Sequence, residues 1–262
     1  MTKKDVKNMK IALICIAKSE DSYLHEWLQY HLRLGFDEVF VYENNWRYLF
    51  KDAFEDDPVH FIPFDGEVMQ LKAYNTFIKE HGNDFDWAAF IDVDEFITKN
   101  GCRSLKEILE ANSDAAQLGI NWRLMGSSGL HKNDSSSTSV VERFTKGDKS
   151  LNKHVKQIVN LAFFKNNSLP FPVFINPHCT NCCSFSLSHR KFFGPFQMNG
   201  LEEKHELELY HYAVKTPEEL HEKVMRGRAD TIISRVNEEQ EYFQEHDKND
   251  IECLEAKNFW LS

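Results

Sequence analysis

Residues 86–98 read DWAAFIDVDEFIT, an apolar run that ends in carboxylates. The apolar part is typical of a buried strand, and on an extended backbone the side chains of Asp92 and Asp94 point the same way. Two neighbouring carboxylates repel each other unless a cation or a proton lies between them. Open α/β sheets bind ligands at the carboxyl ends of their strands. The stretch therefore predicts a site for Mg²⁺ or Mn²⁺, with a solvated acidic turn as the alternative.

The residues that precede this stretch predict a parallel sheet. Residues 10–17, KIALICIA, are typical of a strand covered on both faces, and residues 23–32 carry apolar side chains at helical spacing before Gly35. Residues 37–44, DEVFVYEN, predict a second strand. Strand, helix and strand in this order form a βαβ unit, so we expect an α/β fold with a mostly parallel sheet.

Helix start signals recur later in the chain. Ser104 stands three residues before Glu107, the spacing of a capping box, and predicts a helix. Thr216 followed by Pro217 predicts the start of another helix, expected over residues 217–235. No internal repeat or linker marks a domain boundary, so we expect a single domain.

Composition excludes some classes of protein. The 262 residues include 31 Lys and Arg against 41 Asp and Glu, a net charge of -10, and no dense basic run. A nucleic-acid-binding role is therefore not expected. No apolar stretch approaches the roughly 18 to 20 residues of a membrane-spanning helix, and no secretory signal is evident. We expect a cytoplasmic protein with reduced cysteines, and peripheral contact with the inner membrane face stays open.

Six sequence elements, taken in order, resemble bacterial relatives of glycosyltransferase families 2 and 92. They are AKSEDSYLHEWLQYHLRLGFDEVFVYENN (17–45), DWAAFIDVDEF (86–96), NWRLMGSSG (121–129), NPHC (176–179), LYHYAVKTPEEL (209–220) and MRGRAD (225–230). The resemblance covers most of residues 10–230. In the family the first element usually reads K-N-E, and here Ser19 replaces the Asn.

The resemblance implies a fold of the GT-A type: one Rossmann-like, mostly parallel sheet flanked by helices, with a smaller antiparallel region on the acceptor side. Within a single domain over residues 1–262, residues 10–100 would form the nucleotide-binding half and residues 101–235 the acceptor-binding half. Residues 236–262 would be a C-terminal tail. The implied activity is metal-dependent transfer of a hexose from a nucleotide diphosphate sugar, UDP-linked in our expectation, to a glycan or lipid-linked glycan. We expect inversion at the sugar.

Site residues follow from the motifs and from the resemblance. His211 resembles the late histidine that completes the metal site in many GT-A enzymes, here with Asp92 and Asp94. The expected cation is Mn²⁺ or Mg²⁺, and imidazole is a common ligand for ions of the Mn²⁺ class. The residues expected to bind the nucleotide sugar are Lys18, Glu20, Glu43, Asn44, Lys72, Asp92, Val93 and Lys215. Those expected to bind the acceptor are Trp122, Arg123, Gly126, Ser127, Ser128 and His178. Glu202 and Glu203 are the expected general base, which inverting transfer requires.

Two other functions use similar motifs. A nucleotidyltransferase also pairs aspartates with a metal on an α/β sheet, but typically has a glycine-rich loop after the first strand. Here that position reads AKSEDS, residues 17–22, without glycine. A non-catalytic module that binds a nucleotide sugar is the second alternative, and activity measurements distinguish it.

Overall fold

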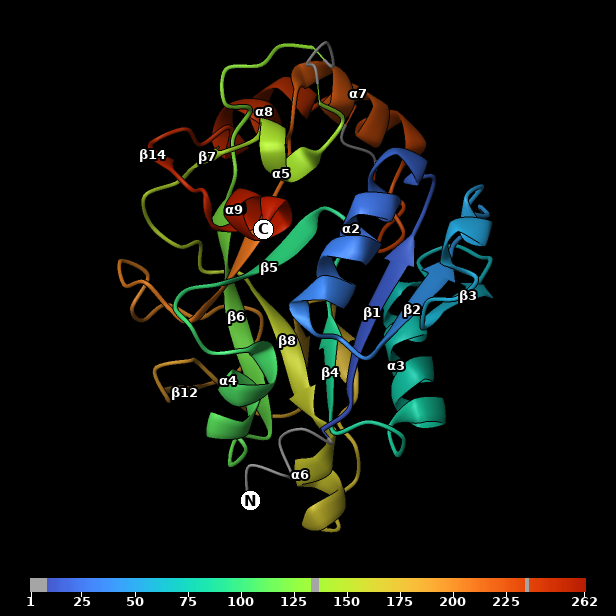
Figure 1. Ribbon diagram of the computed structural model, residues 1–262. Coiled ribbons are helices and arrows are strands. Elements are labelled where there is room, and N and C mark those ends of the chain that lie inside the picture. Colours follow the sequence, from blue (N-terminus) through green and yellow to red (C-terminus); the bar gives the residue numbers. More distant parts are fainter. Residues whose placement is uncertain (1–8, 133–136, 234–235) are drawn as a thin grey trace.

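The computed structural model describes residues 9–132, 137–233 and 236–262, and its centre is a ten-stranded sheet (Figure 1). The strands are β1 Ile11–Ala17, β2 Glu38–Glu43, β3 Val59–Pro63, β4 Trp87–Phe90, β5 Glu95–Lys99, β6 Gln117–Leu124, β7 Lys146–Gly147, β8 Val155–Asn160, β9 Phe174–Asn176, β10 Cys179–Thr180, β11 Ser184–Phe185, β12 Lys191–Phe192, β13 Leu207–His211 and β14 Ile251–Glu252. The helices are α2 Asp21–Leu34, η1 Lys51–Phe54, α3 Gln70–His81, α4 Leu105–Ala111, α5 Val140–Arg143, α6 Leu161–Asn166, α7 Pro217–Arg226, α8 Glu239–His246 and α9 Glu255–Leu261.

The sheet has a parallel half and a mixed half. In the order β12-β11-β6-β8-β4-β1-β2-β3, the four strands from β4 to β3 are parallel. Strand β8 runs antiparallel to both β4 and β6, and β13 joins β6 to β5. The α/β fold class with a βαβ start and an antiparallel region beyond β4 is thus confirmed.

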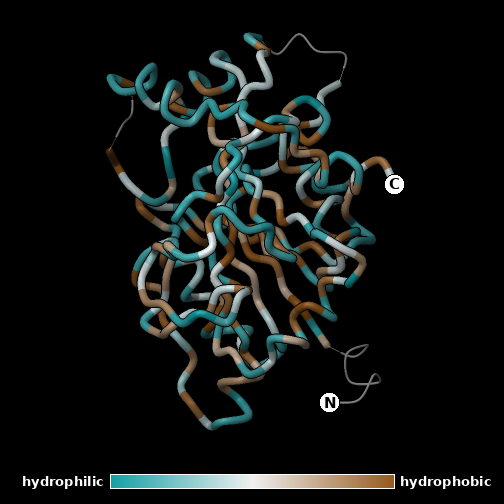
Figure 2. Tube along the Cα trace, turned by 90° about the vertical axis from the view of Figure 1, so that its left-hand side faces the viewer, coloured by the Kyte–Doolittle hydropathy of each residue, from teal (hydrophilic) through white to brown (hydrophobic). Residues whose placement is uncertain are grey.

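Alternate residues of β1 explain why helices cover both faces of the sheet. Ile11 and Leu13 pack in one cluster with Trp27 of α2, whereas Ala12 and Ile14 pack in another with helix α3. Successive side chains of a strand point to opposite faces, so an apolar run buries both. In Figure 2 apolar stretches run through the middle of the molecule.

The stretch 86–98 is not one extended strand, as the sequence predicts, but two strands joined by a tight turn. Strand β4 ends at Phe90 and β5 begins at Glu95, whose amide donates to the Asp92 carbonyl at 3.0 Å. Strand β4 pairs with β1, whereas β5 pairs with β13. The two aspartates therefore lie where the chain changes direction at the carboxyl end of β4.

The C-terminal part of the chain crosses the same end of the sheet. Helix α7 begins after the predicted N-cap Thr216, which forms a capping box with Glu219, but it ends at Arg226, where Gly227 adopts a positive φ of 77°. The last two residues of the helix predicted over 217–235 lie outside the described residues. Figure 1 shows α7 and α8 across the top of the sheet, at the end to which β1 points.

Residues 236–262, predicted as a tail, form α8, β14 and α9. Strand β14 pairs with β7, and α9 packs on β5 and α5. Among the described residues, no helix is both long and apolar enough to span a membrane.

Candidate active site

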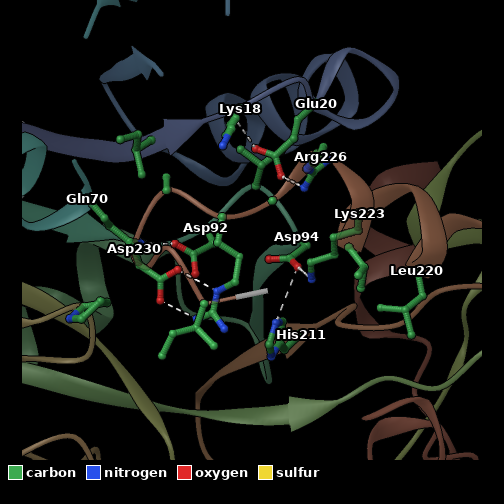
Figure 3. Close-up of a pocket in the computed structure, with 18 of the residues that line it drawn as sticks. Lys18, Glu20, Gln70, Asp92, Asp94, His211, Leu220, Lys223, Arg226 and Asp230 are labelled. Atoms are coloured by element: carbon green, nitrogen blue, oxygen red, sulfur yellow. Dashed lines mark hydrogen bonds and ion pairs between the residues drawn. The ribbon is translucent and has the colours of Figure 1, made fainter. Parts of the chain in front are cut away.

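A cavity of about 170 Å³ opens at the carboxyl ends of β1 and β4, beneath α7 (Figure 3). The predicted site residues that line it are Lys18, Glu20, Asp92, Val93, Asp94, Trp122, His178 and His211. They come from five separate parts of the chain, which the fold brings to one edge of the sheet. This is the edge at which open α/β sheets bind ligands.

Asp92 is held from the side of the sheet. One carboxylate oxygen accepts from Gln70 Nε2 at 2.6 Å, and the other accepts from Lys156 Nζ at 2.9 Å. Burial would raise the pKa of Asp92, but the Lys156 ammonium group holds it below its ordinary value. Lys156 belongs to β8 and its side chain is only 1% exposed, so this cation is a fixed part of the sheet. Asp92 is thus ionised and already neutralised by the protein.

Asp94 is held from the opposite side, by the C-terminal part of the chain. Its carboxylate accepts from Lys223 Nζ of α7, and His211 Nε2 lies 3.7 Å away. Burial opposes ionisation, yet the Lys223 ammonium group, together with the neighbouring His211 ring, keeps the pKa of Asp94 well below its usual value. The two aspartates therefore have separate cations from different elements.

His211 ends β13 and lies against Trp122, with ring centroids 4.1 Å apart. Burial lowers the pKa of His211, although the Asp94 carboxylate opposes this effect. Its Nδ1 atom is buried and has no hydrogen-bond partner among the residues that the structure describes. A neutral imidazole beside a carboxylate, with an unused ring nitrogen, is suitable for a ligand or an ion.

The same wall of the cavity continues in aromatic rings. Trp122 stacks on His154 at 4.9 Å and meets His178 edge-on at 5.1 Å. Burial lowers the pKa of His178 to about 3 and that of His154 to about 4, so both rings are neutral at physiological pH. The wall presents flat, uncharged surfaces next to the carboxylates.

Helix α7 supplies two cations of the cavity, Lys223 and Arg226, that the sequence analysis did not assign to the site, and Arg228 follows them. Lys223 reaches Asp94, and Arg226 binds Glu20 at 2.5 Å. Arg228 pairs with Asp230, and both line the cavity (Figure 3). Residues three apart on a helix share a face, so the spacing of Lys223 and Arg226 was a usable signal.

Glu43, Asn44 and Lys72, predicted to bind the nucleotide, do not line the cavity. Glu43 is fully buried and accepts from Tyr48 N and Lys51 Nζ, both in the segment after its own strand. Asn44 donates to the carbonyls of residues 64 and 66. Lys72 lies over the ring of Phe64 at 5.8 Å. These polar groups stabilise the loops after β2 and β3.

Lys215 and Arg123 are also turned away from the cavity. Lys215 is buried, donates to the Tyr212 carbonyl and lies 4.3 Å from the ring of Tyr23. Burial lowers its pKa to about 8. Arg123 forms a buried ion pair with Glu208 at 2.8 Å. It follows Trp122 in strand β6, so its side chain points to the opposite face.

Gly126, Ser127 and Ser128, predicted to contact the acceptor, are covered by the C-terminal segment. Ser127 N donates to Asp247 Oδ1 at 2.6 Å, and Ser128 N donates to Asn249 Oδ1 at 2.8 Å. A Cβ at Gly126 would lie 2.2 Å from the carbonyl oxygen of residue 248. The glycine is thus explained by the close approach of the chain's own backbone.

Glu202 and Glu203, the expected base, lie at the wrong end of β13. Both are exposed, and Glu202 accepts from Ser150 Oγ at 2.9 Å. Strand β13 is five residues long, which corresponds to roughly 16 Å. Glu202 and Glu203 precede this strand, whereas the cavity lies at its last residue, His211.

The comparison with known proteins gives one weak sequence relative. A stretch of 130 residues is 24% identical to a glycosyltransferase family 92 protein of rice, Oryza sativa subsp. japonica. The alignment covers 43% of this chain and 20% of that protein, so the chain matches about a fifth of its relative's length. No family model matches the chain.

Solved structures resemble the chain in outline. TarS of S. aureus has a TM-score of 0.38 and 16% identity, with 61% of this chain and 30% of TarS covered. HddC from Yersinia pseudotuberculosis has a TM-score of 0.39 and 11% identity, with 82% of this chain and 97% of HddC covered. A UDP-glucose pyrophosphorylase complexed with UDP-glucose has a TM-score of 0.33 and 10% identity, with 78% of this chain and 90% of the pyrophosphorylase covered. No residue's role follows from these likenesses.

Proposed function

We propose that the protein is a glycosyltransferase that moves a hexose from a nucleotide diphosphate sugar, UDP-linked in our proposal, to a hydroxyl of a glycan. One observation carries the proposal: Asp92 and Asp94 lie in a cavity at the carboxyl end of β4 together with His211 and the cations of α7. The weak similarity to a family 92 glycosyltransferase supports the same reaction class.

A divalent cation such as Mn²⁺ or Mg²⁺ is part of the proposal. Among the described residues, no group of three His, Cys, Asp or Glu side chains stands ready to hold a metal. Asp94 and His211 nevertheless offer a carboxylate and an imidazole 3.7 Å apart, a donor set that suits Mn²⁺. A bound cation would act as a Lewis acid on the departing diphosphate. Asp94 and His211 would hold it, and Asp92 would face the donor's ribose or sugar.

The acceptor would lie against the aromatic wall. Trp122 and His178 stay in this role, because both line the cavity and present apolar ring surfaces. Inversion at the sugar requires a base within reach of the acceptor hydroxyl. Glu202 and Glu203 are replaced in this role by carboxylates of the cavity, of which we favour Asp230, next to the lining residue Ile233.

The test is hydrolysis and transfer with a panel of nucleotide sugars in the presence of Mn²⁺. We expect one UDP-sugar to yield UDP and free sugar, and Asp94→Asn to abolish this reaction. Asp65→Asn, an exposed aspartate paired with Arg47, is the control and should retain full activity. Formation of UTP from a UDP-sugar and pyrophosphate would indicate a nucleotidyltransferase instead. Binding without turnover of any donor would indicate a non-catalytic module.

A further inference from the structure

Two cations of α7 are bound to carboxylates of the cavity. Lys223 binds Asp94, and Arg226 binds Glu20 at 2.5 Å while also donating to the Ser19 carbonyl. In both pairs the cation comes from α7 and the acid comes from a loop at the carboxyl end of a strand. Figure 3 shows both pairs at the same side of the cavity, with Lys18 next to Glu20.

These pairs differ from the ion pair that holds Asp92. Lys156 is 1% exposed and lies within the sheet, whereas the side chain of Lys223 is 23% exposed and that of Arg226 is 20% exposed. Lys156 cannot leave Asp92, whose own side chain is 37% exposed, without its ammonium group staying uncompensated in the core. The partly exposed cations of α7, Lys223 and Arg226, can exchange partners. The cavity thus combines one permanent cation with two exchangeable ones.

A third cation, Lys18, lies close to the two exchangeable cations Lys223 and Arg226. A Cβ added at Gly227, the residue after Arg226, would lie 3.5 Å from Lys18 Nζ. The Lys18 ammonium group is therefore beside the end of α7. Each of these side chains can donate several hydrogen bonds to phosphate oxygens, and such charge-assisted bonds are the strong ones.

We propose that Lys18, Lys223 and Arg226 form the diphosphate site of the donor, and that Asp94 and Glu20 occupy this site as surrogate anions until the donor arrives. This inference rests on the proposed function for the identity of the ligand, a nucleoside diphosphate. When the ligand binds, its phosphate oxygens replace the two carboxylates as partners of α7. Asp94 is then free for a divalent cation or for the sugar.

The proposal predicts opposite changes in diphosphate affinity when Asp94 and Lys223, the two members of one ion pair, are substituted. In a buffer with EDTA, no divalent cation links Asp94 to the ligand, so Asp94 only competes for Lys223. Asp94→Asn should then tighten diphosphate binding severalfold. Lys223→Met and Arg226→Met should each weaken it by about tenfold or more, because a charge-assisted hydrogen bond contributes about 1.5–3 kcal/mol.

The experiment is calorimetric titration of the full chain with inorganic pyrophosphate and with UDP, in EDTA. Asp65→Asn is the matched control for Asp94→Asn, because it breaks an ion pair with Arg47 outside the cavity, and it should leave the affinity unchanged. Lys51→Met is the control for Lys223→Met, since it removes a 2.8 Å pair with Glu43 outside the cavity. The double variant Asp94→Asn, Lys223→Met leaves no unpaired charge and should bind as weakly as Lys223→Met alone. Circular dichroism verifies the fold of each variant.

Two results would overturn the inference: weaker pyrophosphate binding by Asp94→Asn in EDTA, or unchanged binding by Lys223→Met and Arg226→Met. Failure of the proposed function is distinguishable. If pyrophosphate and UDP bind with the expected signs while no nucleotide sugar is turned over, the diphosphate site stands and glycosyl transfer does not. If a UDP-sugar is turned over but the variants do not change diphosphate affinity as expected, glycosyl transfer stands and the diphosphate site does not.

Discussion

Lys156 is the residue on which the ionised state of Asp92 depends. Its ammonium group lies 2.9 Å from Asp92 and 3.8 Å from the fully buried Glu95. Removal of Lys156 leaves the fully buried Glu95 and the 37% exposed Asp92 without their cation, which costs more than the roughly 0–1 kcal/mol of an exposed pair and up to the roughly 3–5 kcal/mol of a buried one. We therefore expect Lys156→Met to lower the free energy of unfolding by about this amount in urea denaturation.

Lys204→Met is the control for this prediction. Lys204 also pairs with a carboxylate, Glu255 at 2.5 Å, but its side chain is 62% exposed. Exposed pairs contribute about 0–1 kcal/mol, so this variant should be close to the unchanged protein. Equal losses for the two lysine variants would contradict the role of Lys156 in the sheet.

The second prediction at the scale of residues concerns the general base of the proposed transfer. The double variant Glu202→Gln, Glu203→Gln should keep transfer activity within about twofold, because both side chains are exposed at the far end of β13. Asp230→Asn should reduce kcat by about 10²-fold or more if its carboxylate takes the acceptor proton. Steady-state rates with a fixed donor measure both. A large loss in the double variant, with Asp230→Asn active, would restore the original assignment.

Single residues were predictable where the chain before them fixed their place. Asp92 and Asp94 follow an apolar strand, and His211 ends another, so strand direction alone brings them to one edge. Glu43 also ends a strand, yet its carboxylate turns to Tyr48 N and Lys51 Nζ. Side-chain direction at a strand end depends on the loop that follows, which a local pattern does not reveal.

At the scale of elements, α7 shows how local capping supports the site. Thr216 Oγ1 accepts from the amide of Glu219, and the Glu219 carboxylate also binds Arg143. Loss of such a cap costs about 1 kcal/mol. We expect Thr216→Ala to speed hydrogen exchange in α7 and to weaken UDP binding by up to about fivefold, because Lys223 and Arg226 lose their support.

Helix α4 provides the matched control for that prediction. Ser104 and Glu107 form the same capping box, but α4 contributes no residue to the cavity. Ser104→Ala should therefore lower stability by a similar amount, about 1 kcal/mol, without any change in UDP affinity. If both variants weaken UDP binding equally, the effect is on global stability and the link to α7 is wrong.

The helix starts at Ser104 and Thr216 were predicted from sequence, but the ends of the elements were not always. The helix predicted over residues 217–235 ends at Arg226, because Gly227 has a positive φ. The run at 86–98 contains a turn, because β5 pairs with β13, which lies more than 100 residues later. Apolar periodicity reports burial, and it does not report which distant strand provides the partner.

At the scale of the whole molecule, the parallel direction of the first strands followed from the βαβ pattern, whereas the use of residues 236–262 did not. Asp247 and Asn249 bind the amides of the loop at 127–128, and Tyr242 of α8 lines the cavity. The segment was predicted as a C-terminal tail. It is ordered instead by contacts with backbone groups that the rest of the chain leaves open.

The last prediction concerns acid stability, which neutral buried histidines control throughout the molecule. His31 is fully buried. Its Nδ1 lies 2.8 Å from the Trp27 carbonyl and its Nε2 accepts from Ile97 N, so both nitrogens are occupied in the neutral tautomer. Burial lowers the pKa of His31 to about 3, against about 6.5 in the unfolded chain. Below pH 6.5 the unfolded state binds a proton that the folded state refuses.

The contribution of His31 is therefore fully present above pH 6.5 and is lost as the pH falls from there towards about 3. Between pH 6.5 and 5, His31→Gln should show a shallower fall in unfolding free energy than the unchanged protein, by up to about 1.4 kcal/mol per pH unit. Tyr30→Phe, which removes the neighbouring 3.1 Å bond to the Ile97 carbonyl, is the control. It should lower stability equally at every pH in this range, since no group that titrates there is changed. Parallel slopes for His31→Gln and the unchanged protein would mean that His31 is protonated in the folded state, and urea denaturation at three pH values decides the matter.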